Sequence, residues 1–277
     1  AKYVIAIAHL GMDGTTEYWT SEAVIQNTTG IDAMLDGHSH EEYSKTVANK
    51  DGDNVVLAQT KTKLANLGKL TISADGKITS ELISAKDYTK KDEHITEFIT
   101  GITDKFSAEL DKVVGKSEVD LPDSDENGKR LVRNSETALG DLAADAFRIM
   151  MDADIGIMNG GGLRAPIKEG DITLNDILTV FPWGNLPCKM EVTGQTVLDM
   201  LEMGAMKYPK ESGGFLSVSG LKYTILAGVP SSVETNDKGE FVKVAGPRRV
   251  QNVQVLNKKT GVYEPINPNK TYTLGGI

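Results

Sequence analysis

The sequence predicts an α/β protein with two α/β layers and a long helix between them, and three observations support this class. Apolar, β-branched runs at residues 3–8 and 31–35 enclose a helical stretch at 21–27, the strand–helix–strand order of an α/β layer. Apolar residues recur every three or four positions across 89–115. Strand and helix patterns then alternate again after residue 136. The 277 residues are enough for two domains.

The first layer is expected to contain strands that are buried on both faces, because its two apolar runs show no polar alternation. After residue 54 the pattern changes to short strands, and Asp75-Gly76 is typical of a hairpin turn. The strands expected in this part of the chain lie at residues 3–8, 31–35, 55–59, 69–73 and 77–83.

Residues 89–115 predict one amphipathic helix, begun by Thr89 and Asp92 and ended at Gly115. We expect its apolar face to pack on a core, and its position between two differently patterned regions predicts a connector. The polar run at 116–133 predicts a loop. In the last half, Thr173 and Asp176 have the spacing of a capping box. Helices are expected at 136–150, between Thr173 and Phe181, and from Thr193 through Met203, and strands at 154–158, 218–226, 250–256 and 271–274.

Composition excludes several classes of function. The formal net charge of −9 repels phosphate backbones, so sequence-independent binding of nucleic acid is excluded, and a small anionic partner needs local cations or metals. Cys188 is the one cysteine, so no intramolecular disulfide forms. The longest apolar runs fall far short of the ~20 residues that a membrane span needs, so no transmembrane segment is predicted.

Three of the four histidines follow the two strands of the first layer, in His9-Leu-Gly11 and Gly37-His38-Ser-His40. Side chains at strand ends converge on the ligand crevice of α/β sheets, and neutral imidazole binds zinc-like and manganese-like ions. A single histidine is more often structural, but two glycine-flanked motifs at successive strand ends favour a metal site. Two adjacent divalent ions also need carboxylates, and neither Asp13 nor Asp36 follows a strand as a bridging ligand would. The residues therefore predict a partial metal site.

Residues 159–164, Asn-Gly-Gly-Gly-Leu-Arg, follow a predicted strand and combine backbone donors with a guanidinium. Such a run by itself is often just a turn, Trp183 by itself is as compatible with a core position as with base stacking, and Arg133 with a surface position. Together Arg133, Asn159, Arg164 and Trp183 predict a nucleotide cradle, in which Gly161 and Gly162 let the backbone approach the ligand.

These motifs resemble the family of 5′-nucleotidases, UDP-sugar hydrolases and 2′,3′-cyclic-nucleotide phosphodiesterases. The residues that carry the resemblance are the two histidine motifs, residues 134–146 (Asn-Ser-Glu-Thr-Ala-Leu-Gly-Asp-Leu-Ala-Ala-Asp-Ala), residues 159–164, residues 181–185 (Phe-Pro-Trp-Gly-Asn) and residues 213–220 (Gly-Gly-Phe-Leu-Ser-Val-Ser-Gly). The resemblance implies the C-terminal part of a calcineurin-like α/β/β/α sandwich, a connecting helix, and an α/β substrate-binding domain with a mixed sheet. We expect these parts at 1–87, 88–117 and 118–277.

The resemblance also implies site roles and cofactors. His9 and His38 would ligate one of two divalent ions (zinc, manganese or similar) and His40 the other, although family members often carry Gln or Asn at the place of His40. Arg133, Asn159 and Arg164 would hold the nucleoside, and Trp183 stands where the family commonly has a base-stacking Phe. The family's remaining metal and catalytic motifs would precede residue 1, and its second stacking aromatic would follow residue 277. We therefore expect a piece cut at both ends, with no catalytic residue of its own.

The sequence thus predicts a fragment of a dimetal nucleotide phosphohydrolase, nearly inactive by itself, with a nucleotide or nucleoside as partner. In the family a metal-activated hydroxide attacks the phosphate while the second domain binds the nucleoside, and most members are exported to the periplasm, cell wall or exterior. Two alternatives remain open at this point: a non-catalytic module that binds nucleosides or a surface partner, and the same fold acting on UDP-sugars or 2′,3′-cyclic nucleotides. The sequence leaves the oligomeric state open.

Overall fold

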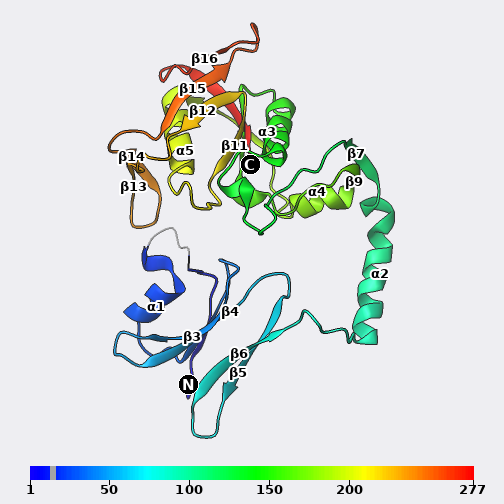
Figure 1. The fold of residues 1–277 in the computed structure, drawn as a ribbon, viewed down its shortest axis with the longest axis vertical. Helices are drawn as coiled ribbons and strands as arrows, with labels where there is room; N and C mark the ends of the chain where they lie inside the picture. Colours follow the sequence, from blue (N-terminus) through cyan, green and yellow to red (C-terminus); the bar gives the residue numbers. More distant parts are fainter. Residues whose placement is uncertain (13–16) are drawn as a thin grey trace. The chain divides into compact units, whose positions relative to one another are not determined.

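The computed structural model describes residues 1–12 and 17–277, which form two compact units (Figure 1). Unit one comprises Ala1–Thr96 with Asn236–Glu240, and unit two comprises Glu97–Thr235 with Phe241–Ile277. Helices and strands occur in both, and each main sheet contains parallel and antiparallel pairs. The predicted α/β class with a mixed sheet is therefore confirmed, whereas the predicted limits at 87/88 and 117/118 stay predictions.

The main sheet of unit one has the strand order β1-β2-β4-β3. Strands β1, β2 and β4 run parallel, β3 runs antiparallel to β4, and Ile7 lies opposite Leu35. Because β1 and β2 are parallel and in register, the segments that follow them leave from the same end of the sheet, where the carboxyl ends of the two strands lie. The elements are β1 (Ile5–Ile7), the short helix η1 (Glu17–Trp19), α1 (Ser21–Asn27), β2 (Ala33–Asp36), β3 (Glu42–Ala48), β4 (Asn54–Thr60), β5 (Asn66–Ile72) and β6 (Ile78–Ser84).

Two features of unit one differ from the prediction. β1 is not buried on both faces: it is an edge strand of the described sheet, and the side chain of Ile7 is 88% exposed. β3 was not predicted, because its polar, interrupted composition has no apolar run. The hairpin of β5 and β6 is confirmed, with Gly76 at a φ of 88° in the turn.

The predicted connector is helix α2 (Glu93–Leu110), which ends before the expected position. Residues 113–117 form strand β7 (Val113–Ser117) instead, paired with β9 (Gly170–Thr173). The expectation that the apolar face of α2 packs on a core is wrong for the described residues: none of its residues is buried, and none belongs to a core cluster. In the part of the chain that the structure describes, no helix is long and apolar enough to cross a membrane.

Unit two is built around a mixed sheet with the order β10-β17-β8-β11. β8 (Ile155–Asn159) sends Ile155 into one core, which contains Val197 of α5 (Gly194–Gly204). It sends Met158 into another core, which contains Leu139 of α3 (Ala138–Met150). The two faces of this sheet thus carry different layers. The elements are η2 (Leu131–Arg133), α3 (Ala138–Met150), β8 (Ile155–Asn159), η3 (Gly160–Gly162), α4 (Leu174–Val180), β10 (Cys188–Thr193), α5 (Gly194–Gly204), β11 (Leu216–Ser219), β12 (Leu221–Ile225), β13 (Val233–Thr235), β14 (Phe241–Val244), β15 (Val250–Leu256), β16 (Tyr263–Pro265) and β17 (Thr271–Gly276).

The predicted cap residues begin the helices of unit two. Thr173 and Asp176 form the reciprocal capping box of α4, and the side chain of Thr193 accepts a hydrogen bond from the backbone of Thr196 at the start of α5. Both contacts satisfy N–H groups that a helix start otherwise leaves without a partner. The local signals for these helices are therefore confirmed.

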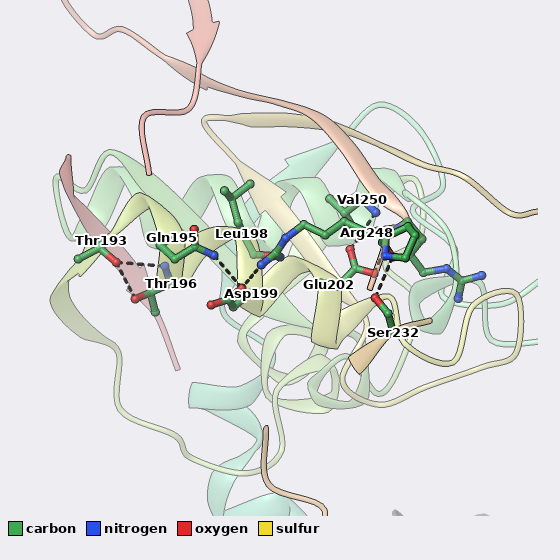
Figure 2. Close-up of polar contacts among 11 residues, drawn as sticks. Thr193, Gln195, Thr196, Leu198, Asp199, Glu202, Ser232, Arg248 and Val250 are labelled. Atoms are coloured by element: carbon green, nitrogen blue, oxygen red, sulfur yellow. Dashed lines mark hydrogen bonds and ion pairs between the residues drawn. The ribbon is translucent and has the colours of Figure 1, made fainter. Parts of the chain in front are cut away.

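A buried carboxylate fastens α5 to the start of β15 (Figure 2). The two oxygens of Glu202, which is fully buried, accept hydrogen bonds of 2.9 Å each from the backbone N–H groups of Arg249 and Val250. The Arg249 guanidinium in turn donates to the carbonyls of Ala205 and Tyr208, just after α5. Both oxygens of Glu202 and the Nη1 of Arg249 thus have partners, which makes the buried charges tolerable, while the buried Nε of Arg249 has none among the described residues.

Replacing Glu202 by Gln is expected to lower the free energy of unfolding by about 2–4 kcal/mol, because the new amide N–H₂ group faces one of the two buried backbone donors. Urea unfolding followed by circular dichroism measures the change. The control is Asp199→Asn, since Asp199 pairs with Arg248 in a half-buried position, where we expect about 1 kcal/mol or less. Equal stability of wild type and Glu202→Gln would contradict the role of this carboxylate.

Candidate functional site

Two of the three predicted histidines of unit one, His9 and His38, come together at the end of the parallel pair β1 and β2. The ring centroids of His9 and His38 are 5.1 Å apart, with an angle of 70° between the rings. A Cβ atom at Gly37 would lie 3.0 Å from His9 Nδ1, so the glycine makes room for this imidazole. Parallel strand pairing therefore explains why two histidine motifs far apart in the sequence meet.

The backbone of the second histidine motif is strained. His38 and His40 have φ values of 75° and 59°, in the left-handed region that non-glycine residues rarely adopt. Such residues cost of order 1–3 kcal/mol each and cluster at functional sites. The strain supports a functional role for this turn.

Asp36, the last residue of β2, was not among the predicted site residues. Its carboxylate accepts hydrogen bonds from the backbone N–H groups of Leu10 and Gly11 and from the hydroxyl of Ser21. Burial raises the pKa of Asp36, but these hydrogen bonds, with one from Gly37, outweigh it and hold the pKa below its ordinary value of 3.8. Asp36 thus fixes the turn that carries His9. Its place directly before Gly37 is the signal that could have identified it.

The residues present do not make a complete metal centre. Across residues 1–12 and 17–277, no three His, Cys, Asp or Glu side chains are grouped so that they could hold a metal ion. His9 and His38 fit one side of such an ion, while both oxygens of Asp36 are already bound by protein donors. Asp13 lies outside the described residues.

In unit two the predicted glycine-rich segment forms η3, directly after β8. A Cβ atom at Gly160 would lie 2.0 Å from the carbonyl oxygen of Val132 and 3.1 Å from the Cα of Arg133. Only glycine permits this approach, which brings η2 and η3 together and places Arg133 beside the segment. Gly162 is buried, and a Cβ atom there would lie 2.3 Å from the methyl carbon of Met158, so the visible effect of this glycine is packing.

The carbonyl of Gly213 ties this segment to the loop before β11. It accepts a hydrogen bond of 3.0 Å from the Asn159 side-chain amide and one of 2.9 Å from Gly161 N. One residue away, Ser212 N donates to the carbonyl of Arg133. The backbones around Arg133, Asn159 and Gly161 are therefore held by the same loop. Gly213 is not among the predicted site residues, although it belongs to residues 213–220, one of the segments that carry the family resemblance.

Arg164 and Trp183 contact each other. The guanidinium carbon of Arg164 lies 5.5 Å from the centre of the Trp183 ring, and Nη1 donates to the carbonyl of Gly161 over 3.2 Å. A guanidinium over an indole face is an attractive arrangement. It also orients the indole against the glycine-rich segment.

A second guanidinium, that of Arg130, lies near Arg164. It donates to the carbonyl of Leu163 and pairs with Asp123 over 3.4 Å. Burial, and then the charge of Arg130, lower the pKa of Arg164, and Asp123 partly opposes the shift. Two guanidiniums against one carboxylate give this neighbourhood an excess of positive charge, which suits an anionic ligand. Sequence reasoning missed Arg130, because nothing local distinguishes it from other basic residues of a polar loop.

Trp183 also borders an apolar cavity of 360 Å³. The indole is 60% exposed, so it is not a core residue. The volume lies in the range of small-molecule pockets, which is ~300–1,000 Å³. The cavity is lined by Ala143, Ala146, Phe147, Met150, Gly162, Leu178, Phe181, Trp183, Gly184, Asn185 and Ile277.

Comparison with known proteins identifies relatives for most of the chain. It is similar to the trifunctional nucleotide phosphoesterase protein YfkN of Bacillus subtilis, with 32% identity over 80% of this chain and 15% of the relative. It is also similar to a 5′-nucleotidase of Vibrio parahaemolyticus, with 34% identity over 57% of this chain and 27% of the relative. The chain therefore spans far less than the full length of these relatives.

Solved structures show the same fold. The 5′-nucleotidase precursor from Thermus thermophilus has a TM-score of 0.68 and 26% identity, covering 91% of this chain and 50% of that one. A putative 5′-nucleotidase from Staphylococcus aureus, at a TM-score of 0.63 and 16% identity, covers 99% of this chain and 52% of that one and supports the fold alone. A model of the family described as 5′-nucleotidase, C-terminal domain, matches residues 113–275. The chain belongs to the 5′-nucleotidase family and contains its C-terminal domain.

Proposed function

We propose that unit two is the nucleoside-binding part of a nucleotide phosphohydrolase of the 5′-nucleotidase type. The observation that carries the proposal is the contact between Arg164 and Trp183, beside an apolar cavity and within the family's C-terminal domain. An exposed indole next to a cavity offers a π-face on which a base stacks. The neighbouring guanidiniums attract the anionic side of a nucleotide.

In this proposal each predicted residue has one role. The base stacks on Trp183, and Arg133 and Arg164 face the sugar and phosphate side. Asn159, fixed by Gly213, presents its side-chain amide to the ligand. Gly161 and Gly162 offer backbone close to it. The match of residues 113–275 to the family supports these roles.

The proposal for the whole protein includes hydrolysis supported by two divalent ions, zinc, manganese or similar. His9 and His38 would supply imidazole ligands to one ion and His40 to the other, consistent with the short distance between the first two rings. The carboxylate ligands that two close cations need are not grouped with them in residues 1–12 and 17–277. We further propose that the protein is exported, in line with the resemblance.

A second candidate is favoured by that incomplete donor set: the polypeptide 1–277 binds nucleosides without hydrolysing nucleotides. Both candidates share the cradle of unit two and differ only in whether chemistry occurs. Two measurements therefore separate them, one of binding and one of turnover.

Adenosine is expected to bind, and Trp183→Ala is expected to weaken binding by ~1–3 kcal/mol, because the stacking face is lost. Isothermal titration calorimetry measures both affinities. Trp19→Ala is the matched control, since it removes the other tryptophan, which lies in unit one, and should leave the affinity unchanged. Equal affinity of wild type and Trp183→Ala would refute the proposed cradle.

Hydrolysis of AMP by the polypeptide 1–277 is expected to stay far below the ~1–10³ s⁻¹ typical of enzymes, with zinc or manganese added. The physical reason is that neutral imidazoles leave the charge of two close cations unbalanced. Release of inorganic phosphate measures the rate, and a well-folded sample is shown by its binding of adenosine. Turnover in the enzymatic range would show that the donor set is sufficient.

A further inference from the structure

Strand β11 forms an edge of the main sheet of unit two. Among the described residues its one paired neighbour is β8. Gly160 N donates to the carbonyl of Phe215 across this antiparallel pair, and hydrogen-bonded positions alternate along a strand. The backbone groups of Phe215 and Ser217 therefore face β8, and those of Leu216 and Val218 face away from it.

A cavity of 640 Å³ runs along this edge. Three consecutive residues of β11 line it, Leu216, Ser217 and Val218, and successive side chains point to opposite faces of a sheet. A cavity that touches all three therefore follows the edge of the strand rather than one face. The hydroxyl of Tyr223 in β12 reaches across and donates to the carbonyl of Leu216 over 3.2 Å.

The two long walls of this cavity differ in chemistry. One wall is the apolar face of β12, with Leu221 and Ile225 on either side of Tyr223. The other wall carries Glu136, which directly precedes the N-cap of α3, and Asp141 in the first turn of that helix. The cavity thus has an apolar side, an acidic side and a row of backbone hydrogen-bonding groups between them.

The two carboxylates have no hydrogen-bond or ion-pair partner among residues 1–12 and 17–277. Lys222 also lines the cavity, but its ammonium lies over the ring of Tyr263, 4.2 Å from the ring centre. Burial, and then the charges of Glu136 and Asp145, raise the pKa of Asp141 to about 6. Within the described residues the acidic wall therefore has no counter-charge. A cationic ligand could supply one.

We propose that an extended peptide with a lysine or arginine side chain binds here as an added strand on the edge of β11, its basic side chain against Glu136 and Asp141. Adding a strand to an exposed sheet edge is a recurrent way of recognising peptides: main-chain hydrogen bonds give affinity and alternate side-chain pockets give specificity. The N–H of Val218 and its carbonyl supply the main-chain partners. The apolar wall receives the neighbouring side chains.

The test uses a fluorescein-labelled peptide, acetyl-Thr-Val-Lys-Val-Thr-amide, titrated with the polypeptide 1–277 and followed by fluorescence anisotropy. Two further peptides isolate the contributions: one carries Glu in place of Lys, and one is N-methylated at its three central residues. We expect each change to weaken binding at least about tenfold, because the first reverses a charge and the second removes backbone donors. Equal binding of all three peptides, or none by the first, overturns the proposal.

Two protein variants test the same contacts from the other side. Asp141→Asn removes one carboxylate and is expected to weaken the lysine peptide about tenfold. The matched control is Asp171→Asn, which removes a carboxylate of unit two that does not line the cavity and should leave binding unchanged. Val218→Pro removes the outward N–H, a change that edge strands tolerate because the ladder to β8 is kept. The N-methylated peptide gives the same information if this variant does not fold.

Lowering the pH from about 7.5 to about 5 is expected to weaken binding of the lysine peptide, since Asp141 gains a proton as the pH falls through about 6. The other titratable groups that line the cavity are Glu136, Lys222, Tyr208 and Tyr223, with Asp145 nearby on α3. The Asp141→Asn variant should lose most of this dependence.

Two outcomes distinguish strand binding from cation binding and from the nucleoside cradle. If butylamine displaces the peptide at concentrations similar to those of the peptide itself, the cavity binds small cations and the strand proposal is wrong. Adenosine affinity should be unchanged in Asp141→Asn and Val218→Pro, so that failure here is distinguishable from failure of the nucleoside cradle.

Discussion

The close approach of Gly160 to the carbonyl of Val132 is the constraint on which the candidate site of unit two depends. A single added carbon would lie 2.0 Å from that oxygen, so no other residue fits without moving a backbone. Because the two backbones touch, Arg133 comes beside the glycine-rich segment that carries Asn159 and leads to Arg164. The loop at Gly213 then closes over both. The residues of the proposed cradle are thus positioned by main-chain packing.

Many helices, strands and turns of this fold could be predicted from the sequence, because the signals for them are local. The capping residues Thr173 and Thr193, the turn at Gly76 and the strand before Asn159 each depend on a few neighbouring residues. What could not be predicted depends on partners far away in the chain. Strand β7 exists through pairing with β9, and Arg130 becomes relevant only because the fold places it against Leu163. Likewise, the pattern of α2 correctly predicted a helix but not the exposure of its apolar face.

The two predicted halves of the chemistry differ in the same physical way. In unit one, parallel strands bring His9 and His38 to the same edge, and the hydrogen bonds to Asp36 hold the turn. Two parallel strands are enough to bring imidazole side chains together. Offsetting the positive charge of two close divalent ions also needs carboxylates, and these are not grouped with the histidines in residues 1–12 and 17–277. In unit two, one loop and one turn hold the residues of the proposed cradle. Local motifs therefore predict the proposed nucleoside side of the site more completely than the proposed metal side.

Glu202 and Asp141 show how the same chemical group signals different roles. Both oxygens of Glu202 are matched by buried N–H groups, so its charge is part of the fold. Asp141 has a folded-state pKa of about 6, above its ordinary value of 3.8, so its ionisation is easier in the unfolded chain. Its charge therefore opposes folding as the pH rises from about 4 through about 6, and that cost persists at neutral pH.

In the proposed complex, a carboxylate that costs stability and faces an open strand edge gains a partner from outside the fold. A cationic side chain brought by a bound strand would supply the missing counter-charge and would be favoured by the same field that raises the pKa of Asp141. The backbone groups of Val218 would find partners in the same step. This common requirement for an incoming strand is why the acidic wall and the free edge are most simply understood as one site.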